Sequence, residues 1–183
     1  MLYHQFAETL PPYELRNSSV LALWLFPNNS PLKPISQIEK AWAQELPAKR
    51  SRQYAHSRGY ARQALADLWR IQPLAVPLRT PPGQPPELDS GWGFISISHC
   101  CDVLLIGWSL TKLGVDVERA DRSFAADRLA ERYFSHEEKA IFDKLHGDDR
   151  REAVLEQWII KEAAIKWQRG NLAKDFGQWS YLK

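Results

Sequence analysis

Two carboxylates stand two positions apart in the stretch GVDVE, residues 114–118. In an extended chain successive side chains point to opposite sides, so Asp116 and Glu118 share one face while Val115 and Val117 share the other. Carboxylate oxygens, together with waters and phosphate oxygens, are the ligands that Mg²⁺ prefers. The pattern predicts a short strand with an acidic face that could take part in metal-assisted chemistry.

Further charges occur in a helix that the periodicity predicts over residues 149–169. Glu162 and Lys166 fall within its apolar stripe, where about 100° separates successive residues. A buried carboxylate or ammonium is costly unless it pairs or binds a ligand. A simple ion pair four residues apart is one interpretation, but such pairs belong on an exposed face. The apolar position favours a functional site.

Cationic side chains occupy comparable places. Arg58 projects from the apolar stripe of a helix predicted over residues 47–70, and Arg62 lies at its edge. An arginine can extend its head to water, so an interfacial role stays open for Arg58. His99 follows a predicted strand, and the alternative to a functional role is a structural, hydrogen-bonded histidine. The candidates sort by charge into possible cation ligands (Asp116, Glu118, Glu162) and possible phosphate partners (Arg58, His99, Lys166).

The elements that position these residues follow from hydrophobic periodicity and turn signals. Proline-rich residues 73–91 are predicted to form a loop. The order of strand, helices, sheet and helices indicates an α/β chain whose halves meet near residue 111. We expect a buried strand at 20–26, strands at 94–98, 103–110 and 112–118, and helices at 35–46, 47–70, 123–134, 135–146 and 149–169, the fourth starting with a capping box at Ser135 and Glu138.

Length and composition exclude several classes of protein. The chain of 183 residues is 44% hydrophobic and 25% charged, as in soluble globular proteins. It has no apolar run long enough for a membrane span, and its start lacks the pattern of a secretory signal, so we expect a cytoplasmic protein. Cys100 and Cys101 are adjacent and offer no zinc spacing. The helix predicted over residues 47–70 is rich in basic residues, so nucleic-acid binding is a minor alternative to a phosphate site there.

Two of these stretches together resemble the 4′-phosphopantetheinyl transferase family. GVDVE and WIIKEAAIK, residues 158–166, are similar to its paired signature Gly-x-Asp-x-Glu and Trp-x-x-Lys-Glu-Ala-x-x-Lys. SISHC, residues 96–100, looks like the histidine segment of the family, and RSRQYAHSRGYARQAL, residues 50–65, looks like its arginine-bearing helix. The similarity covers about residues 47–172 and is closest in kind to the larger, two-lobed Sfp type.

The resemblance implies a fold and an activity. The fold would be α/β (α+β), with two pseudo-symmetric lobes at residues 1–110 and 111–183, each a small sheet packed with helices. The activity would be transfer of the 4′-phosphopantetheine arm of coenzyme A to a serine of an acyl or peptidyl carrier protein. Such carriers serve fatty acid, polyketide or nonribosomal peptide biosynthesis, and adenosine 3′,5′-bisphosphate is released.

The resemblance also implies roles for single residues. Asp116, Glu118 and Glu162 would hold Mg²⁺ on the diphosphate, and with Lys166 they form the implied catalytic set. Glu162 would also be the base for the carrier serine, directly or through water, and Lys166 would stabilise charge on the phosphate. The implied coenzyme A contacts are Arg58, Arg62, Ser98, His99, Lys161 and Lys166, with Arg58 and His99 near the 3′-phosphate.

The sequence departs from the family pattern at two places. Gln84 stands where the family often has the lysine of a Gly-Lys-Pro loop, so we expect coenzyme A to bind more weakly or differently. Relatives of this type continue past the last helix, which predicts a shortened second lobe here. The alternative to an active enzyme is a relative that binds coenzyme A or a carrier without transfer. By the resemblance we expect a monomer whose carrier partner contacts Arg122, Arg128 and Arg132.

Overall fold

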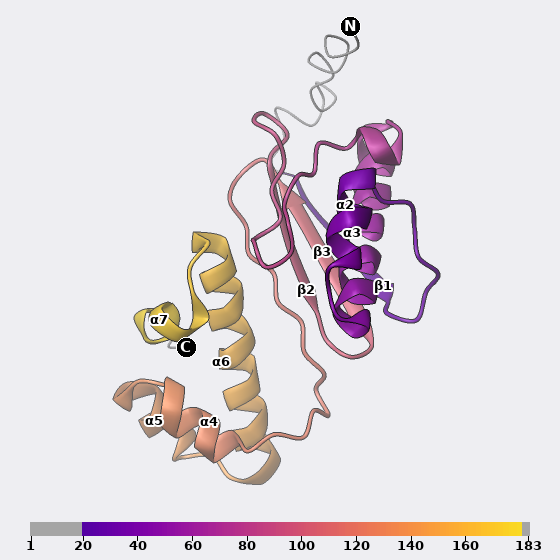
Figure 1. The fold of residues 1–183 in the computed structure, drawn as a ribbon. Helices are drawn as coiled ribbons and strands as arrows, with labels where there is room; N and C mark the ends of the chain where they lie inside the picture. Colours follow the sequence, from indigo (N-terminus) through magenta and orange to yellow (C-terminus); the bar gives the residue numbers. More distant parts are fainter. Residues whose placement is uncertain (1–19, 181–183) are drawn as a thin grey trace, which may run out of the picture.

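A computed structural model describes residues 20–180, in which a three-stranded antiparallel sheet separates two groups of helices (Figure 1). The start of the chain, which bears on the predicted absence of a secretory signal, lies outside the described residues. Among residues 20–180 no helix is long and apolar enough to cross a membrane. The sheet comprises β1 (Leu21–Pro27), β2 (Phe94–His99) and β3 (Val103–Ser109) in the order β1-β3-β2.

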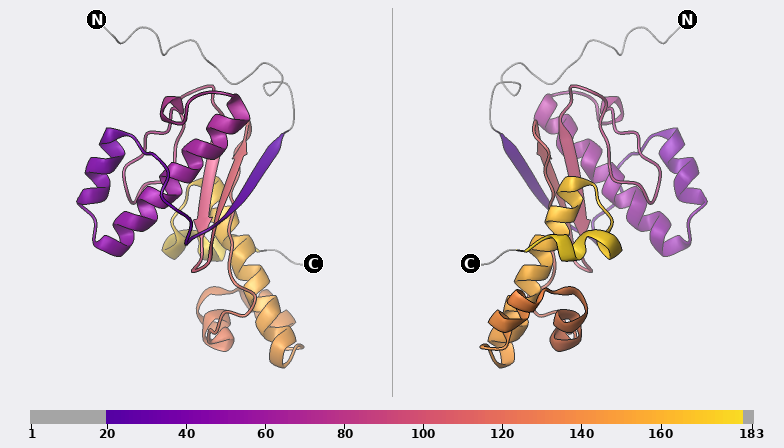
Figure 2. Two further views of the ribbon diagram at one scale, coloured as in Figure 1. Left: turned by 90° about the vertical axis from the view of Figure 1, so that its right-hand side faces the viewer. Right: turned by 90° about the vertical axis from the view of Figure 1, so that its left-hand side faces the viewer.

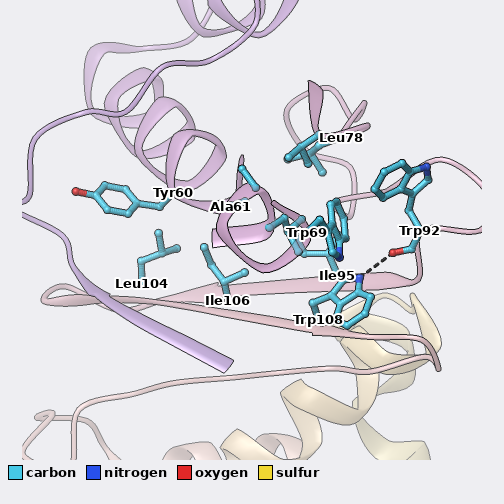
Figure 3. Packing of buried hydrophobic residues seen from close by; sticks show 12 residues of the cluster. Tyr60, Ala61, Trp69, Leu78, Trp92, Ile95, Leu104, Ile106 and Trp108 are labelled. Atoms are coloured by element: carbon cyan, nitrogen blue, oxygen red, sulfur yellow. Dashed lines mark hydrogen bonds between the residues drawn. The ribbon is translucent and has the colours of Figure 1, made fainter. Parts of the chain in front are cut away.

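One face of the sheet is covered by the two helices that the periodicity predicts. These are α2 (Gln37–Gln44) and α3 (Ala48–Trp69), and a short 3₁₀ turn, η1 (Pro73–Ala75), follows them. The core between α3 and the sheet is apolar and rich in tryptophan (Figure 3). In it the Trp108 indole nitrogen donates a hydrogen bond to the Trp92 carbonyl oxygen at 2.7 Å. This core fixes the strand ends that carry Ser98 and His99.

The prediction of a fully buried first strand is wrong. Ala22, Trp24 and Phe26 pack toward the α3 core, but the side chains of Leu21, Leu23 and Leu25 are 57%, 54% and 61% exposed. The alternation follows from the pleat, which sends successive side chains to opposite faces.

The prediction of a further strand at residues 112–118 is also wrong. We call these residues the crossing segment, because they run extended over the sheet face opposite α3 without joining its hydrogen-bonded ladder. Their backbone amides find side-chain partners instead: Val115 N–H donates to Ser96 Oγ at 3.1 Å and Val117 N–H to Ser98 Oγ at 3.4 Å. Serine hydroxyls thus replace the carbonyl oxygens of a neighbouring strand.

The rest of the chain is helical. It forms α4 (Ala126–Tyr133), α5 (His136–Phe142), α6 (Gly147–Gln168), α7 (Leu172–Asp175) and a 3₁₀ turn, η2 (Phe176–Gln178). The predicted capping box at the start of α5 is confirmed, but this helix ends at Phe142, and a turn at residues 143–144 leads to α6, which starts at Gly147 with φ of 54°. An aromatic cluster that includes Phe134, Phe142 and Phe176 holds these helices together.

The mixed α/β fold class is confirmed, with one small antiparallel sheet packed against helices. The second small sheet that the family resemblance implied is not found among the described residues 111–180, which contain helices and extended segments. The apolar surfaces of α4, α5 and α6 are buried against one another by aromatic side chains, and no sheet is needed to cover them.

Candidate active site

The C-terminal part of α6 lies against the crossing segment, beside the sheet (Figure 2). Gly114 permits this approach, because a Cβ atom at position 114 would lie 1.8 Å from the Ala163 carbonyl oxygen and 2.5 Å from the Trp167 amide nitrogen. The glycine that opens the GVDVE stretch therefore brings the two signature motifs into contact. As a result Lys166 of α6 faces Asp116 of the crossing segment.

Asp116 is the centre of a small polar cluster. Lys166 Nζ donates to Asp116 Oδ1 at 2.6 Å and to Ser98 Oγ at 2.9 Å, and Ser98 Oγ donates to the same Asp116 oxygen at 2.6 Å. The Asp116 side chain is 3% exposed, whereas the Lys166 side chain is 30% exposed. The three residues come from β2, the crossing segment and α6, so the fold builds the cluster from three separate elements.

Glu162, one turn before Lys166, faces the same cluster. Burial removes its carboxyl group from water, and the negative charges of Asp116 and Glu118 act in the same direction, so the pKa of Glu162 rises to about 7 against an opposing effect of Lys166. Asp116 and Glu118 therefore lie close enough to Glu162 for their charges to act on it. We call Ser98, Asp116, Glu162 and Lys166 the charged centre. A carboxyl group that exchanges its proton near neutral pH is suited to general-base catalysis.

The charged centre has the donor chemistry of a magnesium site. Asp116 Oδ2 is buried without a hydrogen-bond partner, and Glu118 forms an ion pair with the exposed Arg122. Within residues 20–180 no three His, Cys, Asp or Glu side chains are already arranged around a common metal position. Surface ion pairs are weak, so Glu118 can leave Arg122 at little cost and complete a set of carboxylate oxygens. The residues fit Mg²⁺, and their role as its ligands stays a prediction.

A cavity of about 770 Å³ opens on one side of the charged centre, next to Glu118. We call it the basic cavity after Lys49 and Arg52 of α3, which line it; Arg119 and Arg122 also line it, but each is paired with an acid. Its size is in the range of small-molecule sites. His99 also lines it, and the pKa of His99 is lowered by loss of water and by the nearby Lys166.

Arg58 is buried beneath the proline-rich loop. Its NH2 group donates to the Thr80 carbonyl oxygen at 3.3 Å, and its guanidinium lies over the Tyr54 ring at 5.1 Å. Its Nε and NH1 atoms are buried without partners, and Tyr54, over whose ring its guanidinium lies, lines a smaller cavity with Gly83 and His99. Unpaired guanidinium N–H groups can bind an anion, so the predicted contact of Arg58 with a phosphate of coenzyme A stays a prediction.

Arg62, predicted as a coenzyme A contact, is a structural residue. Its Nε pairs with Glu39 Oε2 at 2.7 Å, and both side chains are buried. Its NH1 donates to the Val76 carbonyl oxygen at 2.8 Å and its NH2 to that of Leu78 at 2.9 Å. All three nitrogens are therefore used to hold the proline-rich loop and α2 to α3.

Lys161 is likewise held away from the predicted ligand. Its Nζ pairs with Glu138 Oε2 at 2.8 Å, and the side chains of both residues are 1% exposed. The ammonium also lies 4.7 Å from the Phe134 ring centre and 5.1 Å from that of Phe176. The first lysine of the WIIKEAAIK stretch thus joins α6 to α5 inside the protein and does not line the basic cavity.

Sequence reasoning missed two kinds of residue. Glu39 and Glu138 are the buried partners of Arg62 and Lys161; the capping box of Glu138 was predicted without its ion pair, and Ser36 with Glu39 forms a second box of the same kind. Lys49 and Arg52 were not singled out in the helix predicted over residues 47–70, although their spacing of three places them on one helix face. Arg128 and Arg132 are exposed on α4, and their role in carrier binding stays a prediction.

Comparison with known proteins finds a family match over part of the chain. A model of the 4′-phosphopantetheinyl transferase superfamily matches residues 112–182. The match contains Asp116, Glu118, Glu162 and Lys166, so it covers the crossing segment and α6, which build most of the charged centre. It confirms the resemblance to this superfamily over these residues, which make up less than half of the chain. No protein of the curated collection matches the chain.

Proposed function

We propose that the protein transfers the 4′-phosphopantetheine arm of coenzyme A to a serine of an acyl or peptidyl carrier protein, and that the reaction depends on Mg²⁺. The observation that carries this proposal is the meeting of Asp116, Glu162 and Lys166 beside the basic cavity. Carboxylates that could bind a cation (Asp116 and Glu162), a candidate base (Glu162) and a lysine that could bind phosphate (Lys166) then lie in one place. The superfamily match over the same residues supports this assignment.

The transfer forms a bond between the carrier serine oxygen and the phosphorus that bears the pantetheine. The bond from that phosphorus to the bridging oxygen breaks, and adenosine 3′,5′-bisphosphate leaves. Glu162 accepts the serine proton, directly or through water; without a bound cation, burial and the charge of Asp116 raise the pKa of its carboxyl group to about 7. Lys166, already held by Asp116 and Ser98, donates to the phosphate oxygens as their charge grows. Mg²⁺ held by Asp116, Glu118 and Glu162 would neutralise charge on the diphosphate.

The nucleotide end of coenzyme A is proposed to occupy the basic cavity. Lys49 and Arg52 are exposed cations at its wall, and His99 connects the cavity to the charged centre. Arg58 has unused donors, and its neighbour Tyr54 lines the smaller cavity together with His99. These cations offer phosphate contacts in a chain that has Gln84 in place of the family's usual lysine.

The proposed activity is tested with a panel of apo carrier proteins. The protein is incubated with coenzyme A, Mg²⁺ and each carrier, and intact mass is measured. We expect at least one carrier to gain the mass of the phosphopantetheine arm, and the same carrier with its acceptor serine replaced by alanine to gain nothing. If no acyl or peptidyl carrier gains mass, while a known transferase modifies the same panel, the proposal is wrong.

Metal binding is expected to stabilise the protein in a pH-dependent way. The folded pKa of Glu162 is raised above its ordinary value, so without metal the free energy of unfolding falls as the pH rises from about 4.5 to about 7. Mg²⁺ binds the deprotonated carboxylate, and it should therefore restore stability above pH 7 but not at pH 5. With Mg²⁺ about tenfold above its dissociation constant, we expect the Tm at pH 8 to rise by about 3–5 °C.

The test and its matched control are the same acid-to-amide change at two positions of α6. Glu162→Gln should abolish both the metal effect and its pH dependence. Glu152→Gln, whose side chain is 68% exposed in a surface pair with Arg151, should leave both unchanged. Thermal unfolding followed by circular dichroism measures the shift, and an equal Mg²⁺ effect at pH 5 and pH 8 would contradict the prediction.

A further inference from the structure

A second hollow lies on the other side of Lys166 from the basic cavity. It has a volume of about 180 Å³, and its walls come from β2, the start of the crossing segment, the end of α6 and the proline-rich loop at Pro85 and Pro86. Phe94, Leu113 and Trp167 give these walls an apolar part, and the cations Lys112, Lys166 and Arg169 also line the hollow. We call it the edge groove, because β2 is an edge strand of the sheet.

The basic cavity, the charged centre and the edge groove lie in a row. Along β2, Ser96 lines the groove, Ser98 belongs to the charged centre and His99 lines the cavity. The crossing segment repeats this order, from Leu113 at the groove to Glu118 at the cavity. Coenzyme A has parts in the same order, namely a charged nucleotide, a diphosphate and an uncharged arm with two amide groups.

The backbone of β2 has free hydrogen-bonding groups on the side of the groove. Cys100 N–H donates to the Val103 carbonyl oxygen at 3.1 Å at the turn between β2 and β3. In an antiparallel pair the residues that bond to the partner alternate, so Phe94, Ser96 and Ser98 bond to β3. The N–H and C=O groups of Ile95 and Ile97 therefore point outward, and both residues line the edge groove. Within the described part of the chain no strand pairs with this edge.

We propose that the edge groove binds the pantetheine arm of coenzyme A in the manner of an added strand, with its amides bonded to the backbone of Ile95 and Ile97. This inference rests on the proposed function. Each amide of the arm carries a donor and an acceptor, as a peptide does, and an exposed sheet edge binds extended peptides by the same bonds. The methyl and methylene groups of the arm are suited to the apolar walls at Phe94 and Trp167.

The position of the arm fits the direction of the reaction. Lys166 stands between the groove and the charged centre, so the phosphorus that carries the arm would lie at Lys166 while the nucleotide lies beyond Glu118. Transfer then moves the arm and its phosphate away from the nucleotide, and the two products leave from different hollows. The arm need not cross the basic cavity.

The donor on the strand edge can be removed without breaking the sheet. Proline is tolerated where the N–H faces away from the neighbouring strand, and Ile97 is such a position. Ile97→Pro removes the edge donor, and Ile97→Ala is the matched control, since it also loses side-chain packing but keeps the N–H. We expect Ile97→Pro to bind coenzyme A about three- to tenfold more weakly than Ile97→Ala. Adenosine 3′,5′-bisphosphate, which lacks the arm, should bind both variants equally, as measured by calorimetry.

A second measurement uses the unaltered protein and does not depend on a variant being stable. Isoleucine is labelled with ¹⁵N, and the Ile97 amide signal is assigned as the one lost in Ile97→Val. Coenzyme A should shift the Ile95 and Ile97 signals, and adenosine 3′,5′-bisphosphate should leave them in place. If coenzyme A binds and transfers its arm but these two signals do not move, the groove assignment is wrong and the proposed function stands. If neither ligand binds, both fail.

Discussion

An Asp116→Asn protein is expected to transfer phosphopantetheine about 10²- to 10³-fold more slowly than the unaltered protein, with its fold intact. The amide keeps the shape of the side chain and removes the charge that Lys166 and Ser98 hold at 2.6 Å. The proposed magnesium ligand set loses its most buried carboxylate, and Lys166 loses the partner that aims it. Because Asp116 is the residue at which the contacts of the charged centre meet, one change disturbs all of them.

Stability should respond little to the same change, because two effects oppose each other. Asp116→Asn weakens the pair with Lys166 but also removes a negative charge that raises the pKa of Glu162. We expect the free energy of unfolding to change by no more than about 1–2 kcal/mol. Asp143→Asn is the matched control, since this acid is 67% exposed in a surface pair with Arg150. Transfer is measured by carrier mass against time, and an Asp116→Asn protein that keeps more than a tenth of the rate would contradict the assignment.

Much of the fold could be predicted, because most elements carry a local signal. Periodicity of 3.6 residues located α2, α3 and α6, and alternation with turn residues located β2 and β3. The crossing segment shows the limit of this reasoning. Its alternation of valine and acid is that of a strand, but alternation reports only that two faces differ. It cannot say whether the backbone amides will meet carbonyl oxygens or, as here, the hydroxyls of Ser96 and Ser98.

The candidate site was predictable in part for a similar reason. Charges at apolar positions of α6 pointed to Glu162 and Lys166, and both do face Asp116. The same rule applied to Lys161 would have placed it on the buried stripe with Trp158 and Ile165, at spacings of three and four. The family motif gave Lys161 a ligand role instead. Only a three-dimensional structure shows that Glu138, from another helix, supplies its buried partner.

Replacing Lys161 by methionine is therefore expected to destabilise the protein by about 3–5 kcal/mol, since it leaves the carboxylate of Glu138 buried without its cation. Such a loss is a large part of the stability of a typical domain and corresponds to a fall in Tm of about 10 °C. Glu138 Oε2 would still accept a hydrogen bond from the Ser135 amide, at 2.8 Å, but one neutral donor does not compensate a buried charge. A second change, Glu138→Gln, should restore stability to within about 2 kcal/mol, because the amide oxygen can keep the helix cap without the charge.

Lys166→Met provides a control on the same helix with the opposite expected result. The Lys166 side chain is 30% exposed, so its loss should cost about 1 kcal/mol of stability or less, while transfer should be lost through the missing phosphate contact. Lys161→Met should show a large fall in stability and, at a temperature where it is folded, a coenzyme A affinity close to that of the unaltered protein. Urea unfolding and calorimetry separate the two. A Lys161→Met protein of normal stability with weakened coenzyme A binding would return Lys161 to the ligand role that the motif implied.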